Sequence, residues 1–250
     1  MADKRNNERD DRPAGKPTNE PASPWRMAEP LALAGVPAAL LACAATGTDA
    51  AGGLTLFATV ACVLLMLVGF ERERPALRQV MPTAVLSAMA AAGRILFAPI
   101  PDVKPVSAIA IVAGATLGRR SGFVVGALAA LLSNAFFGQG AWTPWQMYGW
   151  GMVGWLGGVL AERGWLADGP HLGARLSALG VASGLFYGLV LNGWYVIAYV
   201  RPLAWPGVLA AFAAGLPLDL VHGVATAGFL AAIWLPWRRQ IRRVVGKYGL

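Results

Sequence analysis

The sequence predicts an all-α integral membrane protein of about eight transmembrane helices, and three observations lead to this fold class. The chain of 250 residues is 56% hydrophobic and only 14% charged, which is more apolar surface than a soluble domain of this length can bury. The apolar residues form continuous runs, whereas a membrane-spanning strand would alternate apolar and polar residues. Most of these runs approach the roughly 20 helical residues that cross a bilayer core of about 30 Å.

Eight apolar runs are separated by short polar breaks. They cover residues 29–47, 53–70, 77–97, 105–117, 121–137, 142–161, 175–199 and 207–235. The fourth run is too short to cross a bilayer unaided, so we expect it to be packed inside the bundle or lengthened by neighbouring loop.

The runs divide the chain into four parts. Residues 1–27 are polar and basic, and we expect a flexible cytoplasmic tail. Residues 28–76 hold two runs rich in Ala and Leu, followed by a charged linker, and predict an appended transmembrane hairpin. Residues 77–236 predict a six-helix membrane domain, and residues 237–250 form a second basic cytoplasmic tail.

The positions of the basic residues predict the topology, because Lys and Arg in short loops stay on the cytoplasmic side. With the N-terminus inside, the five cytoplasmic segments hold six, three, two, two and five of the 21 basic residues. The outer loops hold Lys104 and Arg201, and Arg94 lies inside the third run. We therefore expect a multi-pass protein of the cell membrane with both termini in the cytoplasm. We interpret the net charge of +8 as a consequence of how the chain is oriented in the membrane and of contact with anionic lipid.

The motifs of common enzymes are missing from the sequence. It has no Gly-x-Ser-x-Gly elbow, no His-Glu-x-x-His and no phosphate-binding loop ending in Lys-Ser or Lys-Thr, and it has only two His. Cys43 and Cys62 lie inside the first two runs and are interpreted as small apolar fillers rather than metal ligands. Basic runs interleaved with aromatic residues, which would indicate nucleic-acid binding, are also missing. We expect no catalytic site, no cofactor, no metal and no nucleic-acid partner.

Polar side chains inside a bilayer are costly, so their positions point to function. Asn192 and Tyr195 are three residues apart on one helical face, and Trp142 and Gln146 are four apart on another. Such faces either converge on a pocket open to the outside or belong to an interfacial aromatic belt. The candidate contacts near the outer surface are Arg94, Lys104, Asn134, Gln139, Trp142, Trp145, Gln146, Asn192 and Tyr195.

Two titratable residues lie deeper in the last run. Asp219 falls near mid-membrane, and His222 follows three residues later on the same helical face. The pair is either the floor of a ligand pocket, a structural tie between helices, or a proton relay.

A stripe of small residues marks the inner half of the third run. Ala84, Ala88 and Ala92 repeat every fourth residue, and such a stripe lets another helix approach closely. The approaching helix either belongs to this chain or to a partner.

Five segments are specific enough to indicate a family. They read GRILF at residues 93–97, IPDVKPV at 100–106, SNAFFGQG at 133–140, WTPWQM at 142–147 and LPLDLVH at 216–222. Together they resemble the substrate-specific S components of energy-coupling factor (ECF) vitamin transporters, of the cobalamin-type subgroup. The resemblance covers residues 77–236 and leaves the leading hairpin outside it.

The resemblance implies a six-helix substrate-binding module that captures a vitamin on its outer side, beneath the loop of residues 98–105. It also implies a transmembrane T component and two cytoplasmic ATPases as partners, with the T component docked on Ala84, Ala88 and Ala92. Cobalamin or another corrinoid is the favoured ligand, because the segment at 142–146 is similar to that subgroup. Pterins, flavins, thiamin and lipoyl compounds remain alternatives.

The sequence thus favours the vitamin-binding subunit of an ATP-driven importer, without enzyme activity of its own. The competing hypothesis is a proton-coupled carrier or channel in which Asp219 and His222 relay protons. The sequence leaves open whether the hairpin anchors the module, regulates it or replaces a contact. It also leaves open whether the ATPases of the importer are dedicated to this subunit or shared with others.

Overall fold

The computed structural model describes residues 24–46, 50–72, 75 and 77–247. Within these residues the chain forms eight helices and no strand, and each predicted run corresponds to one helix. The helices are α1 (Pro24–Thr46), α2 (Ala51–Arg72), α3 (Leu77–Leu96), α4 (Val106–Leu117), α5 (Arg119–Phe137), α6 (Thr143–Glu162), α7 (Leu172–Tyr199) and α8 (Trp205–Lys247).

Two helices extend beyond the apolar runs that predicted them. The predicted N-terminal tail of residues 1–27 lies mostly outside the described residues, but α1 already begins at Pro24. The last helix does not stop near residue 235, because α8 continues to Lys247 through the basic segment. A lipid-facing helix end can continue into water when basic side chains solvate it, and hydropathy alone places its end too early.

Six of the described helices are long and apolar enough to cross a membrane, so the chain is a multi-pass helical membrane protein. The two others are α4, which has 12 residues, and α6, whose many Gly and Trp residues lower its hydropathy. Every residue of α4 from Val106 to Gly114 is buried. The expectation that the short fourth run is packed inside the bundle is therefore confirmed.

Glycines set the closest helix contacts. A Cβ at Gly154 of α6 would lie 2.1 Å from the carbonyl oxygen of Gly122 in α5, so these backbones touch. A Cβ at Gly184 of α7 would lie 2.3 Å from the amide nitrogen of Gly223 in α8. Small residues at such crossings allow the van der Waals packing that holds helices together in lipid.

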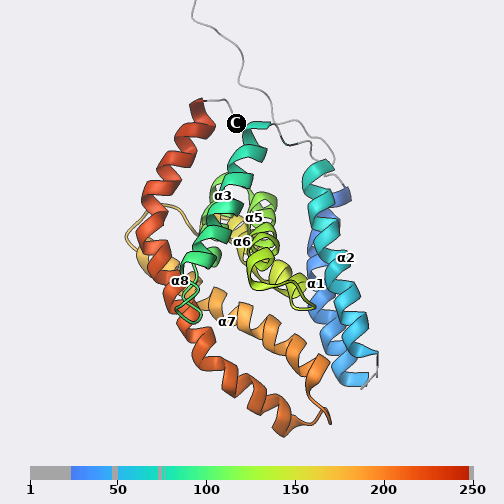
Figure 1. Ribbon diagram of the computed structural model, residues 1–250. Helices are drawn as coiled ribbons and strands as arrows, with labels where there is room; N and C mark the ends of the chain where they lie inside the picture. The colour runs from blue at the N-terminus through green and yellow to red at the C-terminus, as the bar shows by residue number, and fades with distance from the viewer. Residues whose placement is uncertain (1–23, 47–49, 73–74, 76, 248–250) are drawn as a thin grey trace, which may run out of the picture.

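The hairpin of α1 and α2 packs on α5, α6 and α7, along the side of the bundle opposite α3 and α8 (Figure 1). Buried Glu29 of α1 accepts a hydrogen bond from Arg120 and lies 3.2 Å from the Arg119 guanidinium. Tyr148 of α6 donates a 2.8 Å hydrogen bond to the Leu33 carbonyl. Burial of this ion cluster requires its partners to stay together, which fixes the hairpin against α5.

The beginning of α1 and the end of α8 lie at the same end of the molecule (Figure 1). The α4–α5 turn with Arg119 and Arg120 and the extension of α8 with Arg238 contribute basic residues to this end. We refer to it as the basic end. The opposite end carries the loop of residues 97–105, and we call it the outer end after the topology that the sequence predicts.

Candidate functional site

Arg94 joins three helices near the outer end. It lies in the last turn of α3, and its Nη1 donates 2.6 Å hydrogen bonds to Ser133 Oγ and Asn134 Oδ1 of α5. Its Nη2 lies 3.5 Å from Gln146 Oε1 of α6. Hydrogen bonds from a charged donor are the stronger kind, and this guanidinium fixes the outer ends of the three helices.

The amides of α5 and α6 form one network with Arg94. Asn134 is fully buried, and its Nδ2 donates to Thr143 Oγ1 at 3.0 Å and to Gln146 Oε1 at 2.8 Å. The Thr143 hydroxyl donates to Gln139 Oε1 at 2.9 Å. Gly138, with a φ of 98°, makes the tight turn after α5 that brings these residues together. The structure thus unites Arg94, Asn134, Gln139 and Gln146, which we call the amide cluster.

Arg94 also begins a stack of rings through the bundle. Its guanidinium carbon lies 4.9 Å from the Trp150 ring centre, and Trp150 stacks on Tyr187 of α7 at 4.6 Å. Tyr187 stacks on His222 of α8 at 5.1 Å. The His222 Nε2 is 2.8 Å from the hydroxyl of Ser107 in α4. Cation–π and ring stacking thus connect the amide cluster to α8.

Sequence reasoning missed Trp150, Tyr187 and Ser107. Trp150 follows Gln146 by four residues and so shares its helical face, which was a usable signal. Tyr187 and Ser107 have no comparable spacing to a predicted site residue. Their role depends on how α4 and α7 are rotated against their neighbours.

The second polar pair lies between α7 and α8. Asn192 Nδ2 donates a 3.0 Å hydrogen bond to Asp219 Oδ2. The Asp219 carboxylate packs against Gly188, where a Cβ would lie 2.0 Å from the carboxyl carbon. Although Asp219 and His222 share one helical face, they have different partners in the described structure: Asp219 accepts from Asn192, and the Nε2 of His222 faces Ser107. The two side chains leave their common helix toward different neighbours.

A cavity of about 490 Å³ opens above this pair, between the outer ends of α7 and α8. Asn192 and the half-exposed Tyr195 line it, together with Val200, Gly207, Ala211, Ala214 and Gly215. Its volume is in the range of small-molecule sites. A larger apolar cavity of about 910 Å³ lies between α1, α7 and the start of α8. Neither cavity is lined by the amide cluster, whose members bond one another instead.

The loop of residues 97–105 covers the outer end of α3. Lys104 Nζ donates to the carbonyl oxygens of Phe97 at 2.7 Å and Ile100 at 2.8 Å, and so caps the end of α3. Burial raises the pKa of the Asp102 carboxyl above its ordinary value, although nearby Lys104 opposes the shift. Burial lowers the pKa of Lys104, against the opposing effect of Asp102, and Arg94 lowers it further. Lys104 thus stabilises the loop itself.

The predicted tryptophans fall into different environments. Trp142 is 40% exposed and its ring packs over Gly140. Trp145 is fully buried and stacks on Trp194 of α7 at 6.3 Å. Trp142 is therefore accessible from the outer end, whereas Trp145 belongs to the core beneath the hairpin.

The alanine stripe lies on an open face. Ala84, Ala88 and Ala92 are all exposed in the described part of the chain, next to the exposed Met81 and Val85 of the same helix. No helix in the described part of the chain covers this stripe, so in a membrane it faces either lipid or another protein.

Comparison with known proteins places the chain in a family. A family model described as a family of unknown function (DUF6580) matches residues 74–235, which is more than half of the chain. The chain therefore belongs to this family, and α1 and α2 lie outside the matched region. No curated protein and no solved structure matches the chain.

Proposed function

We propose that this member of the DUF6580 family is the substrate-binding membrane subunit of an ECF-type importer, which captures a vitamin from the outside for ATP-driven uptake. The observation that carries the proposal is the convergence of polar side chains from five helices near one end of an apolar bundle. Arg94, Asn134 and Gln146 lie together, and Asn192 with Asp219 forms a second pair below an open cavity. Polar groups in lipid are rare without a function.

The ligand most in keeping with the resemblance is cobalamin or another corrinoid, with other vitamins as alternatives. The cavity of about 490 Å³ is smaller than a whole corrinoid. A large ligand would therefore bind only if the loop of residues 97–105 or the outer ends of α7 and α8 move. The exposed rings of Trp142 and Tyr195 offer the stacking area that planar vitamins need.

The exposed alanine stripe supports a partner-driven mechanism. Ala84, Ala88 and Ala92 leave a smooth surface on α3 for a helix of a T component, which would couple the chain to two ATPases. We expect Ala88→Leu to abolish assembly with the T component while ligand binding stays intact. Equal assembly of Ala88→Leu and wild type would refute this docking surface.

The direct test is ligand binding by the purified full-length protein. Mass spectrometry of released small molecules and calorimetry with a panel of cobalamin, flavin, thiamin, pterin and lipoyl compounds should identify one tight ligand. Asn192→Ala should weaken its binding about two- to tenfold, because a hydrogen bond from a neutral amide contributes about 0.5–1.5 kcal/mol. Gly193→Ala, whose new methyl has only Leu40 near it at 3.9 Å, is the matched control. A folded protein that binds none of the panel would refute the proposal.

The competing carrier is distinguished by its energy source. A proton-coupled carrier would take up substrate without ATPase partners and lose uptake when the proton gradient collapses. An importer subunit would need the ATPases and tolerate collapse of the gradient. Asp219 and His222 have separate hydrogen-bond partners, which favours structural and ligand-binding roles over a direct relay between them.

A further inference from the structure

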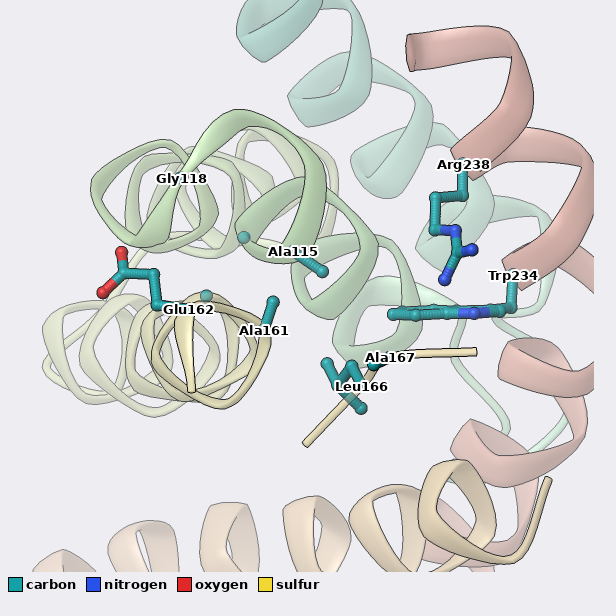
Figure 2. A pocket seen from close by; sticks show the side chains of 10 residues that line it. Ala115, Gly118, Ala161, Glu162, Leu166, Ala167, Trp234 and Arg238 are labelled. Carbon is teal, nitrogen blue, oxygen red and sulfur yellow. The ribbon is translucent and has the colours of Figure 1, made fainter. Parts of the chain in front are cut away.

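A cavity of about 330 Å³ lies at the basic end of the molecule. Figure 2 shows the side chains that line it. Its wall comes from the α4–α5 turn, the end of α6, the loop between α6 and α7, and the extension of α8. The side chains that matter for its chemistry are Trp234 and Arg238 of α8. Its volume is at the small end of ligand sites, so it suits a compact ligand.

Two polar side chains of the cavity wall are hydrogen-bond donors, Arg238 and Trp234, and a third, Glu162, is a carboxylate. Arg238 is buried, and among the described residues it forms hydrogen bonds only through Nη2, which leaves Nε and Nη1 as donors. Trp234 is 2% exposed, and its Nε1 has no hydrogen-bond partner in the described structure. A buried donor without a partner is uncommon and calls for an acceptor. The start of α5, which no side chain caps, adds positive helix-dipole charge at Gly118.

Two carboxylates must be accounted for, Glu162 in the cavity wall and Asp168 outside it. Figure 2 shows the Glu162 carboxylate pointing away from Trp234 and Arg238, and it lies 3.3 Å from the Arg119 guanidinium instead. Asp168, in the loop before α7, accepts from Arg238 Nη2 at 2.6 and 2.5 Å, but its side chain is 67% exposed. An exposed carboxylate returns to water at little cost, so a ligand can replace Asp168 on Arg238.

We propose that this cavity is a binding site for a small phosphate-bearing ligand, held by the Arg238 guanidinium and Trp234 Nε1. Arginine binds phosphate oxygens through parallel N–H donors, and the indole N–H supplies a third donor from the same helix. Because the site lies at the basic end of a membrane protein, the phosphate could belong to a soluble compound or to a phospholipid headgroup. The simpler alternative is that Arg238 and Asp168 only hold the loop before α7 to α8.

The test measures phosphate binding by the full-length protein in delipidated detergent micelles. One arm is equilibrium dialysis with radiolabelled inorganic phosphate and pyrophosphate. The other is native mass spectrometry with phosphatidylglycerol, compared with phosphatidylcholine. Binding in the first arm identifies a soluble ligand, and selective retention of phosphatidylglycerol identifies a headgroup. Either result supports the site only if it depends on the residues that line the cavity.

Three variants and a control decide that dependence. Trp234→Phe keeps the ring and removes the N–H, and should weaken binding about two- to tenfold. Arg238→Ala should weaken it at least tenfold, while Arg239→Ala, exposed and next in sequence, should bind as wild type. Asp168→Asn should strengthen binding because it removes the competing carboxylate, an effect that a purely structural bond does not predict. If Arg238→Ala does not fold, the other two variants still decide.

The proposal is overturned if the wild type binds neither probe, or if Trp234→Phe and Asp168→Asn both bind as the wild type does. These outcomes are independent of vitamin binding at the outer end, so the two proposals fail separately.

Discussion

Replacement of Gly188 by alanine tests the polar pair between α7 and α8. A Cβ at this position would lie 2.0 Å from the carboxyl carbon of Asp219 and 2.1 Å from its Oδ1. Atoms cannot approach so closely, and the short Asp219 side chain has to rotate away. The 3.0 Å hydrogen bond from Asn192 to Asp219 would then be lost.

The magnitude follows from a matched comparison on the same helix. A hydrogen bond to a charged group contributes about 1.5–3 kcal/mol, whereas alanine is more favourable than glycine in a helix by about 1 kcal/mol. Gly193→Ala gains the same helix preference, and its new methyl meets only Leu40 at 3.9 Å. The difference between the two variants therefore measures the lost bond together with the displacement of the Asp219 side chain, and the lost bond sets its scale. At 2–4 °C per kcal/mol for a chain of this size, Tm should differ by roughly 3–12 °C.

The assay uses the protein's own thiols. Cys43 and Cys62 are buried and unpaired with each other, so a thiol-reactive fluorophore reports unfolding of both variants in the same detergent. Gly188→Ala should unfold below wild type, and Gly193→Ala at or above it. Equal Tm values for the two variants would show that Asp219 does not occupy the position against Gly188, and would refute the reasoning.

Three further predictions use the same measurement. Arg94→Ala should lower stability by at least about 3 kcal/mol, because two charged hydrogen bonds to α5, one to Asn134, are lost; an unchanged Tm would exclude a structural role for Arg94. Gly154→Ala should cost about 1–3 kcal/mol or more, since its Cβ would lie 2.1 Å from the Gly122 carbonyl oxygen; wild-type stability would contradict that contact. Asp102→Asn should raise Tm at pH 7, because burial raises the pKa of this carboxyl and penalises its charged form, and asparagine also suits its φ of 53°. Wild-type stability should fall as pH rises through the raised pKa, so the Tm difference between Asp102→Asn and wild type should shrink as pH is lowered toward 3.8. A Tm gain that does not change with pH would show that only the preference of asparagine for positive φ contributes.

The helices could be predicted from the sequence because lipid imposes a simple rule. Each apolar run became a helix, and the run at 105–117, too short to span, became the buried α4. Helix ends were less predictable. Hydropathy does not predict the extension of α8 to Lys247, because a basic segment after an apolar run is compatible with either a continued helix or an irregular tail.

Contacts between helices were only partly predictable. Arg94, Asn134 and Gln146 were predicted because each is a polar residue within an apolar run. The turn at Gly138 brings Asn134 and Gln146 next to each other. The pairing of Asp219 with Asn192 was missed in favour of His222, because spacing along one helix says nothing about the side chains on the next. Trp145 was expected at the pocket, but the sequence does not reveal that the hairpin covers that side of α6.

The bonding of the amide cluster restricts how a ligand could gain affinity there. Arg94, Asn134 and Gln146 already satisfy one another in the described structure, so a polar ligand entering among them exchanges existing hydrogen bonds for new ones. Such an exchange yields little net free energy, because the gain from each new bond is offset by the loss of an old one. Tight binding would then have to come from ring stacking and apolar burial, for which Trp142 and Tyr195 are exposed. The amide cluster would contribute selectivity, since an analogue that enters among these residues without matching acceptors breaks the hydrogen bonds of Arg94 and replaces none of them, at a cost that the correct ligand avoids.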